Sequence, residues 1–349
     1  MPTKLAVALS TLFVVACSGA TPDPAAGPAT GPQVSETPAP STTPDAGAQT
    51  DASKKVGGES VALVQSCTLP VGNRRDPATL IEDLVYASPG GAPQTLDIMQ
   101  PKTPGPHPLV VLIHGGGWAK GDKAMMRPIG GPLTTLGYTV ALLNYRLVQD
   151  SGANPFPAQT SDVRCAVRWL RANAATYGID PTRVASLGTS AGAHLSAMLG
   201  VGDGVAGLDD GTCPAALAPQ SVAVRAAVGF YTPTDFRDAS VWMNNADQGA
   251  GVMGLLGGPI GADPALAALA SPVTHVSSAS APFFLAHGTA DETVPVAQSE
   301  TFTTALRAAG ADATLVTLQD APHAFPVLSD QLPLTSCTTL AFLQKYLTP

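Results

Sequence analysis

The sequence has 349 residues, of which 45% are hydrophobic and 13% charged, so it can bury the core of one large domain or two small ones. The formal net charge is −8 and no run of Lys and Arg occurs, which excludes a nucleic-acid partner held by phosphate neutralisation. The 35 glycines and 33 prolines are too many for a helical bundle.

The N-terminus is predicted to be an export signal. Lys4 precedes an apolar stretch at 5–16, which is too short to span a bilayer but has the pattern of a signal peptide. The residues before and including Cys17 read Val-Val-Ala-Cys and resemble the lipobox of bacterial lipoproteins, in which the cysteine is lipidated and becomes the mature N-terminus. Ordinary cleavage, with Cys17 unmodified, is the alternative. We therefore expect a signal peptide at 1–16, lipidation at Cys17, and anchoring in a bacterial cell envelope.

Residues 17–60 are predicted to be a disordered tether. Seven prolines alternate with Ala, Gly, Thr and Ser between residues 18 and 58, and this stretch has no Leu, Ile, Phe, Trp or Tyr. Such a segment cannot bury enough apolar surface to offset the entropy of ordering it. We expect it to hold the domain at 61–349 away from a membrane that the protein contacts only through the lipid.

Four further cysteines fit an exported protein. Cys67, Cys165, Cys213 and Cys337 are an even number with three possible pairings, of which at least one disulfide is expected. None of the four has the spacing of a metal ligand, so no metal site is predicted.

Residues 61–349 alternate short apolar runs with helical patterns. Strands are expected at 82–87, 95–99, 109–113, 140–144, 183–187, 223–230, 283–286 and 313–317, and helices at 123–136, 159–177, 191–201, 297–309 and 336–347. Continuous apolar strands separated by helices indicate a mostly parallel sheet covered on both faces, with the first two strands antiparallel. The Gly-, Ala- and Met-rich stretch at 235–270 is predicted to form a small cap or lid over a pocket.

A serine nucleophile is predicted at Ser190. The run Gly188-Thr189-Ser190-Ala191-Gly192 follows an apolar strand and precedes a helix. A strand-to-helix turn this tight strains the serine and needs glycine two residues before and after it. A second glycine run, at 115–117 after His114, lets the backbone present N–H groups to a ligand, and together with the Ala191 N–H it could form an oxyanion hole. It lacks the spacing of a phosphate-binding loop.

A base and an acid for this serine are predicted in two later loops. His323 follows the last expected strand, and Asp291 follows the strand before it. Both therefore lie at the carboxyl ends of neighbouring strands, where Ser190 also emerges, in the order Ser, Asp, His. Glu292 is the rival acid, and Asp291 is preferred over it. Among the other histidines, His114 is expected to brace the glycine loop, His194 to pack on the Ser190 helix face and His287 to order the acid loop. His107 is expected to be exposed, and His275 is a candidate for lining the pocket.

The stretch from about Leu96 to the C-terminus resembles α/β-hydrolase-fold esterases. It is most similar to the hormone-sensitive-lipase-like carboxylesterases, in the branch of bacterial feruloyl esterases and acetyl-carbohydrate deacetylases. The residues that carry the resemblance include His-Gly-Gly-Gly-Trp at 114–118, Asn-Tyr-Arg-Leu at 144–147, Gly-Thr-Ser-Ala-Gly at 188–192, His-Gly-Thr-Ala-Asp-Glu-Thr-Val-Pro at 287–295 and Pro-His-Ala-Phe at 322–325. Ala193, and the residues before His323, depart from the usual family pattern without disabling it.

This resemblance implies an eight-stranded, mostly parallel sheet flanked by helices on both faces, with a small cap or lid. It also implies Ser190, Asp291 and His323 as the catalytic triad, and the N–H groups of Gly116, Gly117 and Ala191 as the oxyanion hole. We therefore expect a serine esterase without cofactor that acts on small-molecule or polysaccharide esters of short acyl groups, such as acetyl or feruloyl. A prolyl-oligopeptidase-like peptidase and a non-catalytic envelope binding protein are the alternative hypotheses.

Overall fold

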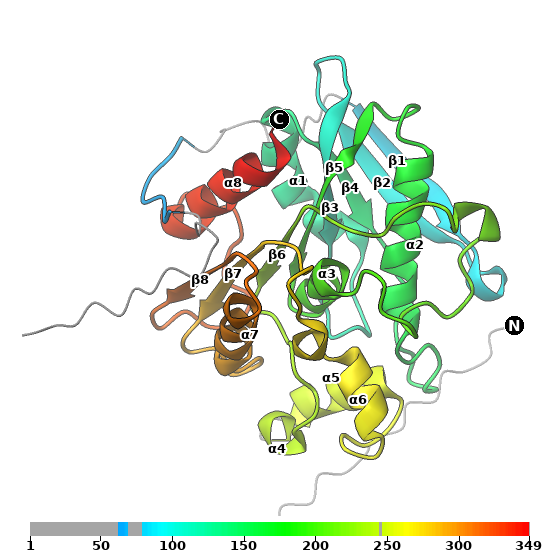
Figure 1. The fold of residues 1–349 in the computed structure, drawn as a ribbon, viewed down its shortest axis with the longest axis vertical. Coiled ribbons are helices and arrows are strands. Elements are labelled where there is room, and N and C mark those ends of the chain that lie inside the picture. Colours follow the sequence, from blue (N-terminus) through cyan, green and yellow to red (C-terminus); the bar gives the residue numbers. More distant parts are fainter. Residues whose placement is uncertain (1–61, 69–78, 244–245, 349) are drawn as a thin grey trace, which may run out of the picture. The chain divides into compact units, whose positions relative to one another are not determined.

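The structure, a computed structural model, describes residues 62–68, 79–243 and 246–348 (Figure 1). The predicted signal peptide at 1–16, Cys17 and the predicted tether at 17–60 lie outside the described residues. In the described part of the chain, no helix combines the length and the apolarity needed to cross a membrane.

The domain is built on one eight-stranded sheet with the order β1-β2-β4-β3-β5-β6-β7-β8. Strand β2 pairs antiparallel with β1 and β4, and all other neighbours are parallel. The strands are Thr79–Ala87 (β1), Gln94–Gln100 (β2), His107–Ile113 (β3), Thr139–Leu143 (β4), Ile179–Thr189 (β5), Ala226–Phe230 (β6), Phe283–Gly288 (β7) and Ala313–Leu318 (β8). The prediction of a mostly parallel sheet that begins with two antiparallel strands is confirmed.

Helices cover both faces of this sheet (Figure 1). The α-helices are Arg127–Thr135 (α1), Ala158–Ala172 (α2), Ala191–Val201 (α3), Ala239–Trp242 (α4), Ala246–Leu256 (α5), Pro264–Ala270 (α6), Ala297–Ala308 (α7) and Pro333–Leu347 (α8). Short 3-10 helices lie at Pro89–Gly91 (η1), Lys123–Met126 (η2), Ala215–Leu217 (η3) and Pro272–His275 (η4).

Two hydrophobic clusters form the core, one on each face of the sheet. One cluster joins the strands to α1 and α8, with Leu133 and Phe342 fully buried. The other joins them to α2, α3 and α7, with Leu195 and Phe302 fully buried. The central strands are apolar on both sides because both sides are covered, which is why β3 reads as an unbroken apolar run.

The predicted cap consists of three short helices, α4, α5 and α6, between β6 and β7. Asp238 caps α4 by accepting a hydrogen bond from Ser240 N, and Asp263 caps α6 by accepting one from Leu266 N. The cap rests on the cluster that contains α3, where Trp242 and Leu255 are buried. The insertion was therefore placed correctly by composition, although its helices were not predicted.

Both pairs of cysteines after Cys17 are bonded. Cys67 is linked to Cys337 on α8, and Cys165 on α2 is linked to Cys213. Next to Cys165 in the sequence, Arg164 donates hydrogen bonds to the Asp209 carboxylate, as does Arg168. At least one disulfide was predicted, and the structure holds two.

Candidate active site

The site lies at the carboxyl ends of β3, β5, β7 and β8. The helix after β3, α1, packs on one face of the sheet, whereas the helix after β5, α3, packs on the other. Neighbouring strands whose connections leave toward opposite faces create a crevice at their carboxyl ends, where ligands bind in open α/β sheets. The glycine run follows β3 and Ser190 follows β5, so both open into this crevice.

Ser190 forms the sharp turn between β5 and α3. Its backbone has φ 52° and ψ −120°, a left-handed conformation that a residue with a side chain rarely adopts. A side chain on Gly188 would lie 2.0 Å from Gly192 O, and one on Gly192 would lie 2.2 Å from Ile113 O. The two glycines therefore allow α3 to begin directly against β3 and β5, which holds the serine in its strained conformation.

Ser190, His323 and Asp291 form one hydrogen-bonded chain. The Ser190 Oγ lies 3.1 Å from His323 Nε2, and His323 Nδ1 lies 2.7 Å from Asp291 Oδ2. A carboxylate can only accept, so Nδ1 carries the proton and Nε2 is free to accept the serine proton. The structure thus brings together the three side chains that the sequence predicted for the triad, and it places Asp291 rather than the exposed Glu292 on the histidine.

The Asp291 carboxylate is held by four donors. Oδ1 accepts hydrogen bonds from the N–H groups of Thr293 and Val294, each at 2.8 Å, while Oδ2 lies 2.7 Å from His323 Nδ1 and 3.2 Å from His287 Nε2. Burial alone would raise the pKa of this carboxyl, but the hydrogen bonds outweigh burial and hold its pKa well below the usual range. Asp291 therefore stays ionised beside the imidazole.

The glycine run faces the serine from the end of β3. Gly116 and Gly117 have φ values of 118° and 60°, and a side chain on Gly116 would lie 2.0 Å from Lys120 O. Within the described part of the chain, the N–H groups of Gly116, Gly117 and Ala191 have no hydrogen-bond acceptor. Three N–H groups near one serine without acceptors can bind an oxygen that gains negative charge.

His114 braces this loop, as the sequence analysis predicted. Its Nδ1 lies 2.7 Å from Gly115 O, and its ring stacks on Tyr145 with centroids 4.4 Å apart. The Tyr145 hydroxyl donates to His114 O at 2.9 Å. Burial lowers the pKa of His114, so the ring acts as a neutral support for the loop.

His194 joins the core to the cap. Trp118 Nε1 donates to His194 Nδ1 at 3.2 Å, and His194 Nε2 lies 2.8 Å from Ala270 O at the end of α6. Because Nδ1 accepts, the proton lies on Nε2 and is donated to the Ala270 carbonyl. Burial lowers the pKa of this fully buried ring to about 4, although the hydrogen bond to Ala270 opposes that effect.

A cavity of about 470 Å³ surrounds the serine, and we call it the cap-side cavity. Ser190, His323, Gly116 and Gly117 line it, together with Trp242 of the cap. Thr189 and Tyr231 also line it, and the sequence analysis did not assign either to the site. Tyr231 directly follows β6, so the rule that ligands bind at the carboxyl ends of strands could have found it.

In the described part of the chain, no group of His, Cys, Asp and Glu side chains is arranged to hold a metal ion. The chemistry that the site offers is that of its own side chains and N–H groups: a serine hydroxyl, a base that can take its proton, an ionised acid, and donors for an oxyanion.

The fold and this site define the chain as an α/β-hydrolase-fold protein, as its sequence resemblance predicted. A family model matches residues 96–306, and the chain belongs to the corresponding family, BD-FAE.

Two curated relatives come from Mycobacterium tuberculosis. Esterase LipQ is 32% identical over 284 residues, which make up 80% of this chain and 64% of LipQ. The probable carboxylic ester hydrolase LipM is 33% identical over 209 residues, or 58% of this chain and 46% of LipM. The aligned part of this chain thus spans less than two thirds of either relative.

Two solved structures are similar over nearly their whole length. A truncated carbohydrate esterase from gut microbiota has a TM-score of 0.63 and 27% identity, covering 78% of this chain and 96% of that one. A propionate-bound esterase from Thermogutta terrifontis has the same TM-score and identity, with 77% and 96% covered.

Proposed function

We propose that the protein is a serine esterase that hydrolyses carboxylic esters of short acyl groups. The observation that carries this proposal is the hydrogen-bonded chain from Ser190 Oγ through His323 to Asp291, beside three N–H groups that have no acceptor among the described residues. The names of the similar proteins, which are an esterase, a probable carboxylic ester hydrolase, a carbohydrate esterase and a propionate-bound esterase, support the same class of reaction.

In the first half of the reaction, His323 Nε2 takes the proton from Ser190 Oγ as the oxygen attacks the ester carbonyl. The carbonyl oxygen becomes an oxyanion and is stabilised by the N–H groups of Gly116, Gly117 and Ala191. Asp291 keeps the imidazole in the correct tautomer and stabilises the imidazolium. His323 then gives the proton to the leaving alcohol oxygen, and the C–O bond breaks to leave an acyl group on Ser190.

In the second half, His323 takes a proton from a water molecule, which attacks the acyl carbon from the side the alcohol has left. The same N–H groups stabilise the second oxyanion. The proton returns from His323 to Ser190 Oγ as the acyl–serine bond breaks, so the carboxylic acid leaves and the enzyme is regenerated.

The proposal is less specific about the substrate than about the reaction. The fold and triad specify acyl transfer, but they do not specify the acyl group. The likeness to a carbohydrate esterase favours acetyl or feruloyl esters of polysaccharides, and the likeness to the propionate-bound esterase favours small carboxylic esters.

We further propose that the enzyme is exported and held at the cell envelope by lipid on Cys17, with residues 17–60 as the tether. The lipobox-like sequence before Cys17 is the basis of this proposal. Two disulfides support it, because such bonds persist in oxidising compartments. Exchange of Cys17 for Ser should release the protein from the membrane fraction into the soluble fraction.

The catalytic proposal is tested with Ser190→Ala. Removal of the nucleophile should lower hydrolysis of 4-nitrophenyl acetate by at least about a thousandfold and abolish labelling by a fluorophosphonate. Ser151→Ala, at an exposed loop position, is the matched control and should retain both. Full activity of Ser190→Ala would refute the mechanism. A wild-type protein inert toward esters but active on peptides would support a peptidase, and one inert toward both would support a binding protein.

A panel of substrates tests the acyl and alcohol classes. The kcat/KM values for 4-nitrophenyl acetate, butyrate and octanoate are compared with those for methyl ferulate and for acetylated xylan. Preference for xylan acetate identifies a carbohydrate deacetylase, and preference for ferulate a feruloyl esterase. Modest rates on all small esters, with none on xylan, identify a general carboxylesterase.

A further inference from the structure

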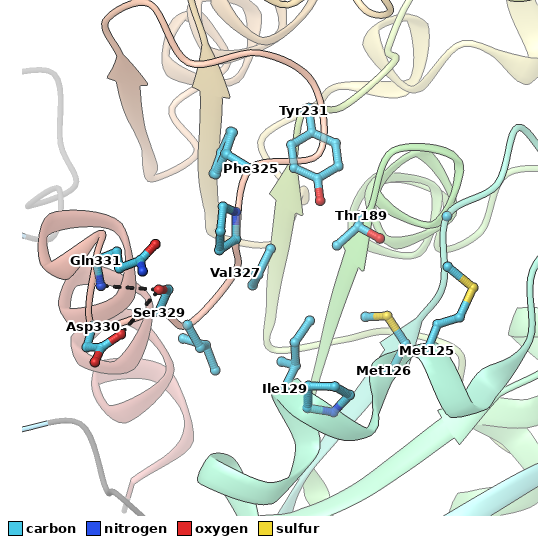
Figure 2. Close-up of a pocket in the computed structure, with 14 residues that line it drawn as sticks. Met125, Met126, Ile129, Thr189, Tyr231, Phe325, Val327, Ser329, Asp330 and Gln331 are labelled. Carbon is cyan, nitrogen blue, oxygen red and sulfur yellow. Dashed lines mark hydrogen bonds between the residues drawn. The ribbon is translucent and has the colours of Figure 1, made fainter. Parts of the chain in front are cut away.

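A second cavity, of about 490 Å³, lies beside the cap-side cavity and has no role in the mechanism above (Figure 2). Met126 and Ile129, at the start of α1, form one wall, and Phe325 and Val327, which follow His323 in the chain, form the other. These residues belong to the core on the α1 and α8 face of the sheet, whereas the cap packs on the opposite face. We call this space the second cavity.

The two cavities meet beside the nucleophile. Gly115, Met125, Thr189 and Tyr231 line both of them. Thr189 directly precedes Ser190, and a side chain on Gly115 would lie 3.3 Å from the Ser190 Cβ. The second cavity is therefore lined by the residue next to Ser190, whose Oγ would carry an acyl group.

Tyr231 forms the shared wall with Thr189. Its hydroxyl points toward Thr189 (Figure 2), and its ring lies edge-on to the rings of His323 and Phe325, with centroid distances of 4.7 Å and 5.1 Å. The backbone has φ 46°, a conformation that costs free energy in a residue with a side chain. Packing on both sides thus fixes the ring between the two cavities.

During the reaction, the carbon bound to Ser190 carries three other groups: the oxyanion, the leaving oxygen and the acyl chain. These groups must point in three different directions. The oxyanion lies at the Gly116, Gly117 and Ala191 N–H groups, and the leaving oxygen must lie near His323 Nε2 to receive its proton. Gly116, Gly117 and His323 all line the cap-side cavity and not the second cavity. The third group, the acyl chain, needs neither a donor nor the base. We infer that the second cavity binds the acyl group of the substrate, an assignment that rests on the proposed esterase activity.

The lining of the second cavity defines the acyl group that it takes. Ile129 and Val327 present apolar side chains to the space, whereas Thr189, next to Ser190, and Tyr231 add hydroxyl groups (Figure 2). Its volume lies in the usual range of ligand pockets and far exceeds an acetyl group, so an extended apolar chain or ring fits. Asp330 at the far end disfavours an acyl group that carries its own carboxylate.

Substitutions at Val327 test this assignment, because Val327 lines the second cavity but not the cap-side cavity. Val327→Trp narrows the space and should lower the ratio of kcat/KM for 4-nitrophenyl hexanoate to that for the acetate by at least about tenfold. Val327→Ala enlarges the space and should raise the octanoate-to-hexanoate ratio about threefold. Leu136→Trp, which introduces the same side chain at an exposed position after α1, is the control and should leave both ratios unchanged.

The outcomes separate this inference from the proposed function. Opposite shifts in the two Val327 variants support an acyl site, since a loss of folding would not raise one ratio and lower another. If the wild type hydrolyses esters through Ser190 but Val327→Trp and Val327→Ala match Leu136→Trp, the acyl site is wrong and the esterase stands. If the wild type hydrolyses no ester, both fail. Should Val327→Trp not fold, the octanoate-to-hexanoate ratio of Val327→Ala decides alone.

Discussion

His323 is set for its proposed task by what lies on each side of its ring. Asp291 fixes the proton on Nδ1, and the edge of the Tyr231 ring packs against the imidazole. His287 supports the acid in turn, with Nδ1 2.7 Å from Ser299 Oγ and Nε2 2.9 Å from Val294 O. The orientation of the base therefore depends on a chain of contacts that reaches from β7 to α7.

Asp291→Asn should lower kcat by about a thousandfold to ten-thousandfold. An amide can donate to Nδ1 and favour the wrong tautomer, and it cannot stabilise the imidazolium. Esterase kinetics under substrate saturation measure the effect. Glu292→Gln, one residue along and exposed, is the matched control and should stay within about threefold of the wild type. The reverse pattern would show that Glu292 is the acid.

Among individual residues, the sequence predicted those that define motifs and missed the site residues that do not. Ser190, Asp291 and His323 could be predicted because each follows a strand in the order of a known constellation. The wall that Thr189 and Tyr231 form between the two cavities could not be predicted, because neither residue defines a motif. Tyr231 also adopts a left-handed conformation that sequence assigns to Gly or Asn.

Among the elements, a buried imidazole joins the cap to the catalytic helix. His194 on α3 accepts from Trp118 and donates to the last residue of α6. A second proton would place an N–H at Nδ1 opposite the Trp118 N–H, so two donors would face each other. Protonation of His194 therefore weakens the link between cap and core.

This link predicts a loss of stability in mild acid. The pKa of His194 is about 4 in the folded state and about 6.5 when unfolded, so the unfolded state binds more protons between these values. The stability is fully present above pH 6.5 and is lost as the pH falls toward 4, by about 3 kcal/mol at the limit. Urea unfolding at pH 7.5, 5.5 and 4.5 measures it.

His194→Gln should flatten that pH dependence, because an amide can accept from Trp118 and donate to Ala270 without titrating. His107→Gln, at the amino end of β3, is the control and should retain the slope of the wild type. An unchanged slope in His194→Gln would mean that other groups account for the acid sensitivity.

The turn between β5 and α3 gives a second prediction for an element. Gly192→Ala places a Cβ 2.2 Å from Ile113 O and 2.4 Å from His114 O, so α3 must move away from β3. We expect a loss of about 2–3 kcal/mol in stability, together with loss of esterase activity. Chemical denaturation and kinetics of one preparation measure both. Gly258→Ala, where a Cβ meets nothing within 4 Å, should change neither.

Element boundaries were predicted less well than element types. The helix expected at 159–177 ends at Ala172, where Asn173 closes the turn through its N–H and side-chain bonds to Trp169 O. The strand expected from 183 begins at Ile179, because His107 of β3 pairs with Ile179. The last helix begins at Pro333, since proline is favoured at the first helical position. These ends depend on capping and pairing, which apolar periodicity does not reveal.

For the molecule as a whole, the sequence predicted one domain with disulfides but not which cysteines pair. Cys67 and Cys337 are 270 residues apart, and only the fold brings them together. Val64 N also donates to Thr338 Oγ1 at 3.0 Å, so the described N-terminal segment is attached to α8 at two points. The predicted boundary at residue 61 lies just before this segment and remains a proposal.

The disulfides predict a dependence of stability on redox state. Cys165 and Cys213 close a loop of 48 residues, for which the chain-entropy model gives on the order of 4 kcal/mol. The double variant Cys165→Ala, Cys213→Ala should unfold with a free energy about 2–4 kcal/mol lower. Thermal scans with and without reductant measure it. Reductant should lower the Tm of the wild type but leave a variant lacking all four cysteines unchanged.

The bond between Cys67 and Cys337 also has a mechanical consequence. A pulling force on the chain ahead of Cys67 reaches the sulfur bridge before it reaches β1, the first strand. The covalent bridge transfers that tension to α8, which packs along β5, β6 and β7 on the face opposite the cap. Tension applied at the N-terminus would therefore pass through α8 and not through β1.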